Sequence, residues 1–193
     1  MKLLPVKTAN EFVLIRPFDA NDIDGLANAG ANPKIWTHYV DAIDGEASSV
    51  KTYLESVLKR HQSGNWIAHT ILTPDGEYVG QSCYMAIHPE HKGCEIGGTW
   101  YAPKFHGTKI NPAAKLALLQ NAFDCGAMRV ELKTDENNLH SRTAILKLGA
   151  KFEGVFRKHM LRSNGIIRNT AYYAIIDDEW GDLKNGLLAR LGE

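Results

Sequence analysis

The segment from Lys104 to Asn111 has the residue types of an anion-binding loop. It carries two lysines, a histidine and a glycine, shows no hydrophobic period, and leads directly into a predicted helix. Asn111 and Pro112 are expected to open that helix, because Asn favours the N-cap and Pro favours the first helical position. A helix start presents unpaired N–H groups and the positive end of the helix dipole, which suits a pyrophosphate. An ordinary capped helix behind a solvated basic loop would give the same pattern.

A second polar pair opens the next predicted helix. Asn138 and Ser141 are three residues apart, so both lie on one face at the helix start. Their side chains are available to a ligand there. Both residue types also favour helix N-termini as plain caps, and the spacing alone leaves the two interpretations open.

His88, His91, Cys94 and Glu95 raise the question of a metal site. The His-x-x-His-x-x-Cys run occupies a short turn and lacks a fourth ligand at a recognised spacing. We therefore predict no metal. Cys125 follows a helix with no histidine in a triad-like context, which favours a buried thiol over an acyl-carrying nucleophile.

Composition narrows the class of protein. The chain has 193 residues, 44% of them hydrophobic and 23% charged, and its formal net charge is zero. This balance gives no electrostatic basis for binding nucleic acid or a membrane surface, and no apolar run approaches the ~20 residues of a membrane span. No signal peptide is apparent. Three cysteines at no framework spacing suit a reducing compartment, so we expect a cytoplasmic protein.

Periodicity and turn residues predict the elements that would position these groups. The expected strands are Glu11–Pro17, Trp66–Leu72, Tyr78–Ile87, Glu95–Tyr101, Arg129–Lys133, Phe152–Leu161 and Thr170–Ile176. The expected helices are a short one capped by Asp22, one capped by Ser48 or Ser49 and ending near His61, one from Asn111 to about Phe123, one from Asn138 to Leu148, and Asp178–Leu191. Three antiparallel strands followed by alternating strands and helices imply a mixed sheet with helices on both faces. No linker divides the chain, so residues 1–193 are expected to form one domain.

Three stretches together resemble a known family. They read IGGTWYAPKFHGTKINPAAKLALLQNAF at 96–123, RVELKTDENNLHSRTAILKLGAKFEGVFRKHM at 129–160 and RNTAYYAIIDDEW at 168–180. Their order resembles the GNAT superfamily of N-acetyltransferases, and more narrowly the branch related to ribosomal-protein N-terminal (alanine/serine) acetyltransferases. The resemblance implies an α+β protein with the GNAT acyl-CoA N-acyltransferase fold, whose central mixed sheet is mostly antiparallel. It also implies acetyl-CoA as co-substrate and no metal.

The resemblance assigns a set of cofactor-binding residues. They are Trp100, Tyr101, Ala102, His106, Gly107, Thr108, Lys109, Ile110, Asn111, Asn138 and Ser141. The loop departs from the superfamily's usual Gln/Arg-x-x-Gly-x-Gly/Ala, because His106, Lys109 and Asn111 occupy the matching positions. A subgroup with Thr-x-Val/Ile-Asn and a following Ala-Lys is a closer match, as Thr108, Ile110, Asn111, Ala114 and Lys115 show.

The resemblance also suggests catalytic roles. Ser141 is the expected donor to the departing CoA thiolate, because the superfamily's frequent tyrosine is replaced by Ile145. A water molecule is the alternative acid. Glu95 is the expected base that deprotonates the amine, directly or through water. A structural ion pair on the strand face is the alternative interpretation of Glu95.

The acceptor is expected to enter opposite the CoA, between the early helices and the late strands. Trp36, His38 and Tyr39 would form one wall, and His159 with the Ser163–Gly165 turn the other. Trp36 and Tyr39 could equally form a core patch. The predicted activity is acetyl transfer to a primary amine: a peptide or protein N-terminus, an amino-acid conjugate or a small amine. A non-catalytic CoA-binding domain, another acyl donor or a hydroxyl acceptor remain alternatives, and the protein could be a monomer or a homodimer.

Overall fold

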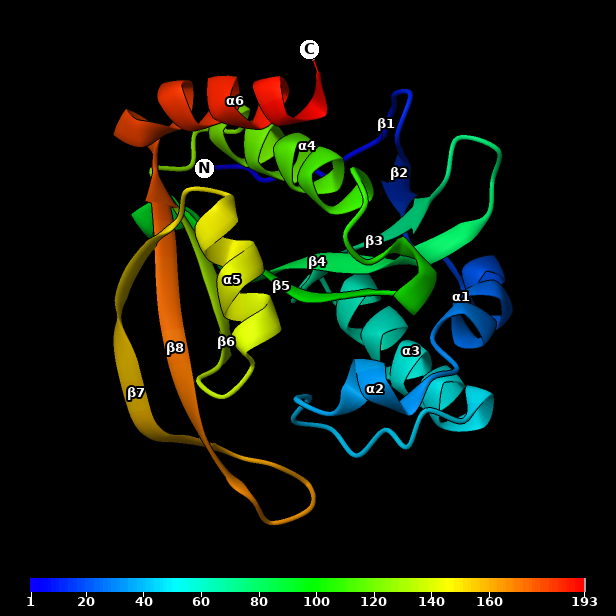
Figure 1. Cartoon of the computed structure of the whole chain (residues 1–193). Helices are drawn as coiled ribbons and strands as arrows, with labels where there is room; N and C mark the ends of the chain where they lie inside the picture. Colours follow the sequence, from blue (N-terminus) through cyan, green and yellow to red (C-terminus); the bar gives the residue numbers. More distant parts are fainter. Residues whose placement is uncertain (193) are drawn as a thin grey trace.

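The computed structural model describes residues 1–192 (Figure 1). Its helices, including the short 3-10 helices η1–η3, are η1 (Ala20–Asp22), α1 (Ile23–Ala29), α2 (Pro33–Trp36), α3 (Ala47–Gln62), η2 (Pro89–His91), η3 (Pro103–Phe105), α4 (Ile110–Asp124), α5 (Leu139–Lys147) and α6 (Asp177–Leu191). Its strands are β1 (Thr8–Ala9), β2 (Leu14–Pro17), β3 (Ile67–Leu72), β4 (Tyr78–His88), β5 (Gly93–Tyr101), β6 (Arg129–Asp135), β7 (Lys151–Leu161) and β8 (Ile167–Ile176).

The strands form one sheet in the order β1-β2-β3-β4-β5-β6-β8-β7. Within the described residues, β5 and β6 pair in parallel and every other neighbouring pair is antiparallel. The predicted mixed, mostly antiparallel sheet is therefore confirmed. The two-residue strand β1 was not predicted, because so short a segment carries no period.

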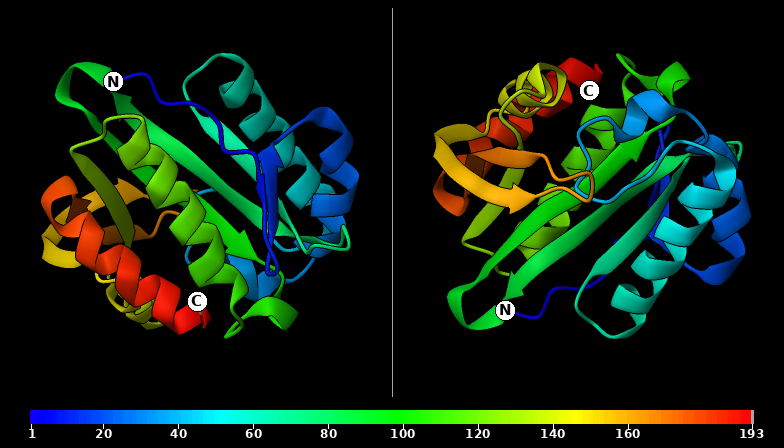
Figure 2. Two further views of the ribbon diagram at one scale, coloured as in Figure 1. Left: turned by 90° about the horizontal axis from the view of Figure 1, so that it is seen from above. Right: turned by 90° about the horizontal axis from the view of Figure 1, so that it is seen from below.

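Helices cover both faces of the sheet, as predicted (Figure 2). On one face α4 and α6 lie side by side over a core that includes Leu118, Leu119 and Leu187. On the other face α1, α2 and α3 pack over a second core. The apolar stripe of α3 is buried through Val50 and Leu54, which confirms the helical period seen in the sequence.

Several predicted caps were wrong. Helix α4 begins at Ile110 with Lys109 as its N-cap, so Asn111 lies in the first turn and does not cap it. The reason is local: the Thr108 hydroxyl accepts a hydrogen bond from the Ile110 N–H at 3.3 Å, so the helix starts two residues earlier than expected. Helix α3 likewise begins after Glu46, and the Ser49 hydroxyl hydrogen-bonds the Glu46 carbonyl at 3.1 Å.

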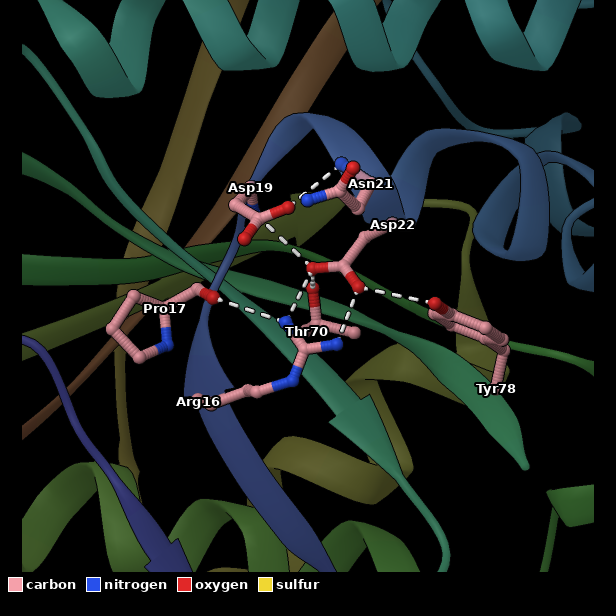
Figure 3. Close-up of polar contacts among 7 residues, drawn as sticks. All are labelled: Arg16, Pro17, Asp19, Asn21, Asp22, Thr70 and Tyr78. Carbon is pink, nitrogen blue, oxygen red and sulfur yellow. Dashed lines mark hydrogen bonds and ion pairs between the residues drawn. The ribbon is translucent and has the colours of Figure 1, made fainter. Parts of the chain in front are cut away.

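Asp22 was predicted to cap the first helix but is a buried anchor between elements (Figure 3). Its side chain is fully buried and receives both Arg16 Nη atoms, at 2.7 and 2.5 Å. The Thr70 hydroxyl donates to it at 2.6 Å and the Tyr78 hydroxyl at 3.2 Å. Burial alone would raise the pKa of Asp22, but these hydrogen bonds hold it below its ordinary value. Asp22 thus ties the start of α1 to β2, β3 and β4, while Asp19 caps η1.

Candidate active site

Strands β5 and β6, at the centre of the sheet, pair over a short stretch and then diverge. Within residues 1–192, the two strands pair with each other only from Gly93 to Glu95 against Arg129 to Glu131; beyond this point β5 pairs with β4 alone and β6 with β8 alone. The register of β5 against β4 shifts in the same region, and Gly98 has φ +57°, a value that favours glycine. The end of β5 is therefore a free edge beside β6, able to accept an extended ligand as a strand would.

The loop before α4 presents a run of free backbone donors. Among residues 1–192, no acceptor pairs with the N–H groups of Gly107, Thr108, Lys109 or Asn111. Gly107 has φ +76° and carries no side chain over the loop, where an added Cβ would meet nothing within 4 Å. Consecutive unpaired N–H groups at a helix start are a binding site for an oxyanion such as a phosphate.

The loop's side chains do not add to this positive potential as the sequence suggested. Lys109 Nζ donates to the carbonyl of Leu191 at 2.7 Å and lies over the Phe12 ring. Lys104 pairs with Glu77 at the surface. His106 Nε2 contacts the carbonyl of Tyr101 at 3.0 Å. The anion site is thus formed by backbone, and Lys109 contributes an N–H group rather than its charge.

Helix α5 begins as the sequence predicted. The Asn138 side chain accepts a hydrogen bond from the Ser141 N–H at 3.0 Å, so Asn138 is the N-cap. The Ser141 hydroxyl is partly exposed and engages no acceptor within residues 1–192. Ile145 is buried on the inner face of the helix. The cap and the free hydroxyl are compatible with each other, because the cap uses only the backbone of Ser141.

Trp100, Tyr101 and Ala102 lie at the end of β5 with buried side chains. Trp100 packs against Trp36 with ring centroids 5.2 Å apart, and the Ala102 N–H donates to Val79 in β4. These side chains are core, so any contact with a cofactor at this edge falls to backbone groups.

Glu95 is buried, at 3% exposure, and its partner is Lys133 of β6 at 2.7 Å. Burial raises the pKa of Glu95, and the Lys133 ammonium opposes that rise. Gly97 leaves room for the carboxylate, because a Cβ there would lie 2.4 Å from Glu95 Oε1. The structure thus contains the ion pair that was the alternative interpretation, and it also gives Glu95 the raised pKa expected of a base. Sequence reasoning missed Lys133, whose only signal was its alternation with Glu131 along a strand.

The expected acceptor walls face each other across the tip of the β7–β8 hairpin. The hairpin is tied to the segment after α2, where Ser163 N–H donates to the Val40 carbonyl at 2.9 Å (Figure 2). A cavity of about 410 Å³ lies at this junction, lined in part by Trp36, Tyr39 and Arg162. Trp36 is only 3% exposed and its Nε1 donates to the Gly30 carbonyl, so it is chiefly core.

His38 and His159 lie on the same side of the molecule. His159 Nδ1 contacts the Thr170 hydroxyl at 3.0 Å and its Nε2 the Tyr172 hydroxyl at 3.3 Å. Burial lowers the pKa of both histidines. Each is therefore mainly neutral at pH 7 and can exchange hydrogen bonds as donor or acceptor.

Lys115 of α4 lies on the face of the sheet that α4 and α6 cover, and its burial was not predicted. Its side chain is buried against Ser82 and Thr99, with Nζ–Oγ distances of 3.3 and 2.7 Å. No carboxylate contacts it within the described chain, and burial lowers its pKa to about 7. The sequence offered no sign of this burial beyond an apolar helix around the lysine.

Three further features bear on the sequence analysis: possible metal ligands, membrane-spanning helices and the cysteines. Within residues 1–192 no group of three potential ligands could hold a metal, and no helix is both long and apolar enough to cross a bilayer. Cys83, Cys94 and Cys125 are free thiols; the first two are buried and Cys125 is partly exposed.

Comparison with protein families decides what this arrangement is. The model of the acetyltransferase (GNAT) domain matches residues 13–151, which include the divided sheet, the loop before α4 and the start of α5. The chain belongs to the GNAT acetyltransferase family. An uncharacterized N-acetyltransferase of Mycobacterium tuberculosis is 31% identical over 80 residues, 42% of this chain and 50% of that protein. The chain thus matches about half the length of its curated relatives.

Solved GNAT structures share the fold over nearly the whole chain. A GCN5-related N-acetyltransferase from Brucella melitensis has a TM-score of 0.86 at 25% identity, covering 96% of this chain and 86% of that one. Mycobacterium smegmatis RimJ in complex with CoA-disulfide scores 0.76 at 21% identity, covering 93% and 89%. The ribosomal-protein-S5-alanine acetyltransferase of Vibrio fischeri scores 0.70 at 17%, covering 91% and 98%. The predicted family and fold are confirmed.

Proposed function

We propose that this GNAT protein transfers an acetyl group from acetyl-CoA directly to a primary amine, with both substrates bound at once. The observation that carries the proposal is the free edge of β5 beside the N–H groups of Gly107, Thr108, Lys109 and Asn111, which are unpaired within residues 1–192. The first suits an extended amide chain and the second a pyrophosphate, and CoA contains both. The CoA-disulfide complex of RimJ, which has the same fold, is consistent with this assignment.

The N–H groups at the start of α4 would hold the pyrophosphate. Their donors are fixed by the turn, so little ordering is needed when the anion binds. The backbone of Trp100 to Ala102 would run alongside the pantetheine, and the start of α5, with Asn138 and Ser141, would lie on its other side. The edge of β5 leads back to Glu95, so the thioester end of acetyl-CoA would lie near that carboxylate.

Two groups would share the proton transfers. Glu95 takes one proton of the acceptor ammonium, directly or through water, and the free amine then forms a C–N bond with the thioester carbonyl. As the C–S bond breaks, Ser141 or a water donates a proton to the CoA thiolate, and the second proton lost by the amine nitrogen replaces the one that this donor gave up. Lys133, 2.7 Å from Glu95, keeps the carboxylate ionised enough to act.

The acceptor would approach from the α1–α3 side of the sheet, past Trp36, His38, Tyr39 and His159. Trp36 and Tyr39 line the cavity beneath the β7–β8 hairpin, and the charge of Arg168 on that hairpin acts on the pKa of both His38 and His159. The acceptor is a small amine, an amino-acid conjugate or a peptide or protein N-terminus, and nucleic acid and membranes are not partners. The three free thiols suit a cytoplasmic enzyme, working as a monomer or a homodimer.

Thermal unfolding with acetyl-CoA tests the cofactor site. At about 100 times its dissociation constant, acetyl-CoA should stabilise the fold by ~2.7 kcal/mol, or roughly 5–11 °C for a chain of this size. Lys109 has φ −70°, so Lys109→Pro deletes one N–H group of the loop without changing that angle. Loss of a hydrogen bond to a charged group should weaken binding about 10–100-fold.

Lys109→Ala is the matched control, because it removes the contact with Leu191 but keeps the N–H group. It should bind acetyl-CoA within a few-fold of the natural protein. An absent thermal shift, or equal losses in the two variants, would refute the assignment of the cofactor loop. Binding without turnover would favour a non-catalytic CoA-binding domain, and turnover only with other acyl-CoA compounds would change the donor.

A further inference from the structure

Two arginines flank the turn of the β7–β8 hairpin and face one carboxylate. Arg162 follows β7 and forms an ion pair with Asp135 at the end of β6. It also donates to the Thr37 carbonyl at 2.9 Å. Arg168 lies at the start of β8, and its charge is close enough to act on Asp135 and on Arg162. The carboxylate of Asp135 is already paired with Arg162.

Arg168 is left without a partner of its own. Within residues 1–192, its guanidinium takes part in no ion pair and no hydrogen bond, and its Nε is buried. Burial lowers the pKa of Arg168, and Asp135 only partly offsets this. A guanidinium stays protonated in proteins, so a positive charge without a counterion of its own lies at this partly buried position.

Two neighbouring side chains, Arg162 and His38, also have a nitrogen without a hydrogen-bond partner in the described chain. The atoms are Arg162 Nε and His38 Nδ1, and both are buried. Arg162 contacts Asp135, and the charges of Asp135, Arg162 and Arg168 all act on the pKa of His38, so these groups lie in one region. Buried polar groups are nearly always hydrogen-bonded, so three unpaired nitrogens in one cluster indicate a missing acceptor.

This cluster adjoins the position where the acceptor amine would react. Arg168 is near enough to Glu95 for its charge to oppose the rise in that carboxyl's pKa, which burial causes. The charge of Arg168 also lowers the pKa of His159, in the same direction as burial does. Strand β8 carries Arg168 and Tyr172 on the face that also presents Lys133 and Glu95. An anion bound by Arg168 would therefore belong to the acceptor rather than to CoA, whose phosphates lie at α4.

We propose that Arg168, with Arg162 and His38 beside it, binds an oxyanion on the acceptor, so that the preferred substrates are primary amines carrying a carboxylate or a phosphate. A planar guanidinium matches the geometry of either group. This inference rests on the proposed function, because it names the acceptor class of the same site. Amino acids and short peptides with a free carboxylate are one source of this chemistry, and amine phosphate esters are the other.

Paired acceptors test the inference in the natural enzyme. Glycylglycine is compared with glycylglycine amide, and phosphoethanolamine with ethanolamine, by kcat/KM for acetyl-CoA-dependent thiol release and by thermal shift without acetyl-CoA. The anionic member of at least one pair should be favoured about 10–100-fold, mainly through KM. The pair that shows the preference identifies the source of the oxyanion.

Arg168→Gln should abolish that preference, so that the ratio of kcat/KM for the anionic over the neutral acceptor falls about 10–100-fold, to near one. Arg157→Gln, at an exposed position of β7, is the matched control and should keep the preference. Arg168→Lys retains the charge and should keep part of it, which guards against a misfolded glutamine variant.

The outcomes separate this inference from the proposed function. Turnover of neutral and anionic amines at equal rates, or a preference that survives in Arg168→Gln, would overturn the oxyanion site while leaving acetyl transfer intact. Thermal stabilisation by the anionic amine alone, lost in Arg168→Gln, would support the site even if no amine were acetylated. No turnover with any amine would instead refute the proposed function.

Discussion

Lys115 provides a test of how this fold tolerates a buried amine. Its pKa of about 7 in the folded chain compares with 10.5 for an ordinary lysine. The folded state therefore binds fewer protons than the unfolded state between these values, so stability rises as pH increases from 7 toward 10.5. At 1.36 kcal/mol per pKa unit, the 3.5-unit difference makes the cost of burial at pH 7 on the order of 4 kcal/mol.

Lys115→Met removes this cost and keeps the apolar stem of the side chain. The two hydroxyls that it leaves remain paired, because Ser82 Oγ and Thr99 Oγ1 are 2.7 Å apart. We expect the variant to be about 2–4 kcal/mol more stable than the natural protein at pH 7, after a discount for the lost hydrogen bonds. The gain should shrink as pH rises and disappear near pH 10, where the lysine of the unfolded chain also loses its charge.

Urea unfolding at pH 7, 8, 9 and 10 measures the difference, provided that the denaturant slope is the same in both proteins. Lys147→Met, at an exposed position of α5, is the control and should show no such trend with pH. A Lys115→Met variant that is less stable by the same amount at every pH would refute the reasoning. It would mean that the fold stabilises the ammonium and that its pKa is not lowered.

Three further predictions concern the anchor and the chemistry. Asp22→Asn should destabilise the fold by about 3 kcal/mol at pH 7, because it leaves Arg16 without its buried partner; since the pKa of Asp22 is lowered on folding, the loss should fade as pH falls below about 4, which urea unfolding would show. Ser141→Ala should lower kcat about tenfold or more with little change in acetyl-CoA affinity, and a natural kcat would make water the acid. Glu95→Gln should lower the rate at pH 7 and lose less at pH 9, where more free amine is present; an unchanged pH–rate profile would remove Glu95 from the mechanism.

The order of elements was readable from the sequence because each carries a strong local signal. The stripe from Val50 to Leu58, the Asn138 cap and the glycine after α5 all reflect interactions within a few residues. The start of α4 was misplaced by two residues, because Thr108 and Asn111 can each accept a hydrogen bond at a helix start and here Thr108 does so. Local pattern cannot decide between two nearby polar residues when both suit a helix start.

The site's long-range partners could not be read in the same way. Lys133 meets Glu95 only because β5 and β6 run parallel at that point, and Arg16 meets Asp22 only because β2 turns into η1 beside β3. Lys109 looked like a phosphate ligand by charge, yet its ammonium reaches the end of α6, 82 residues away in the chain. Residue type and spacing identify candidates, whereas the partner that decides a candidate's role comes from tertiary structure.

The central claim is direct acetyl transfer to an amine, and product analysis tests it most directly. The natural protein is incubated with acetyl-CoA and a panel of neutral and anionic primary amines at pH 8, while thiol release and the mass of each amine are followed together. The account predicts one thiol released for each amine that gains an acetyl group, with no acetylated enzyme intermediate. Thiol release without an acetylated amine, or tight acetyl-CoA binding with no product across the panel, would contradict it.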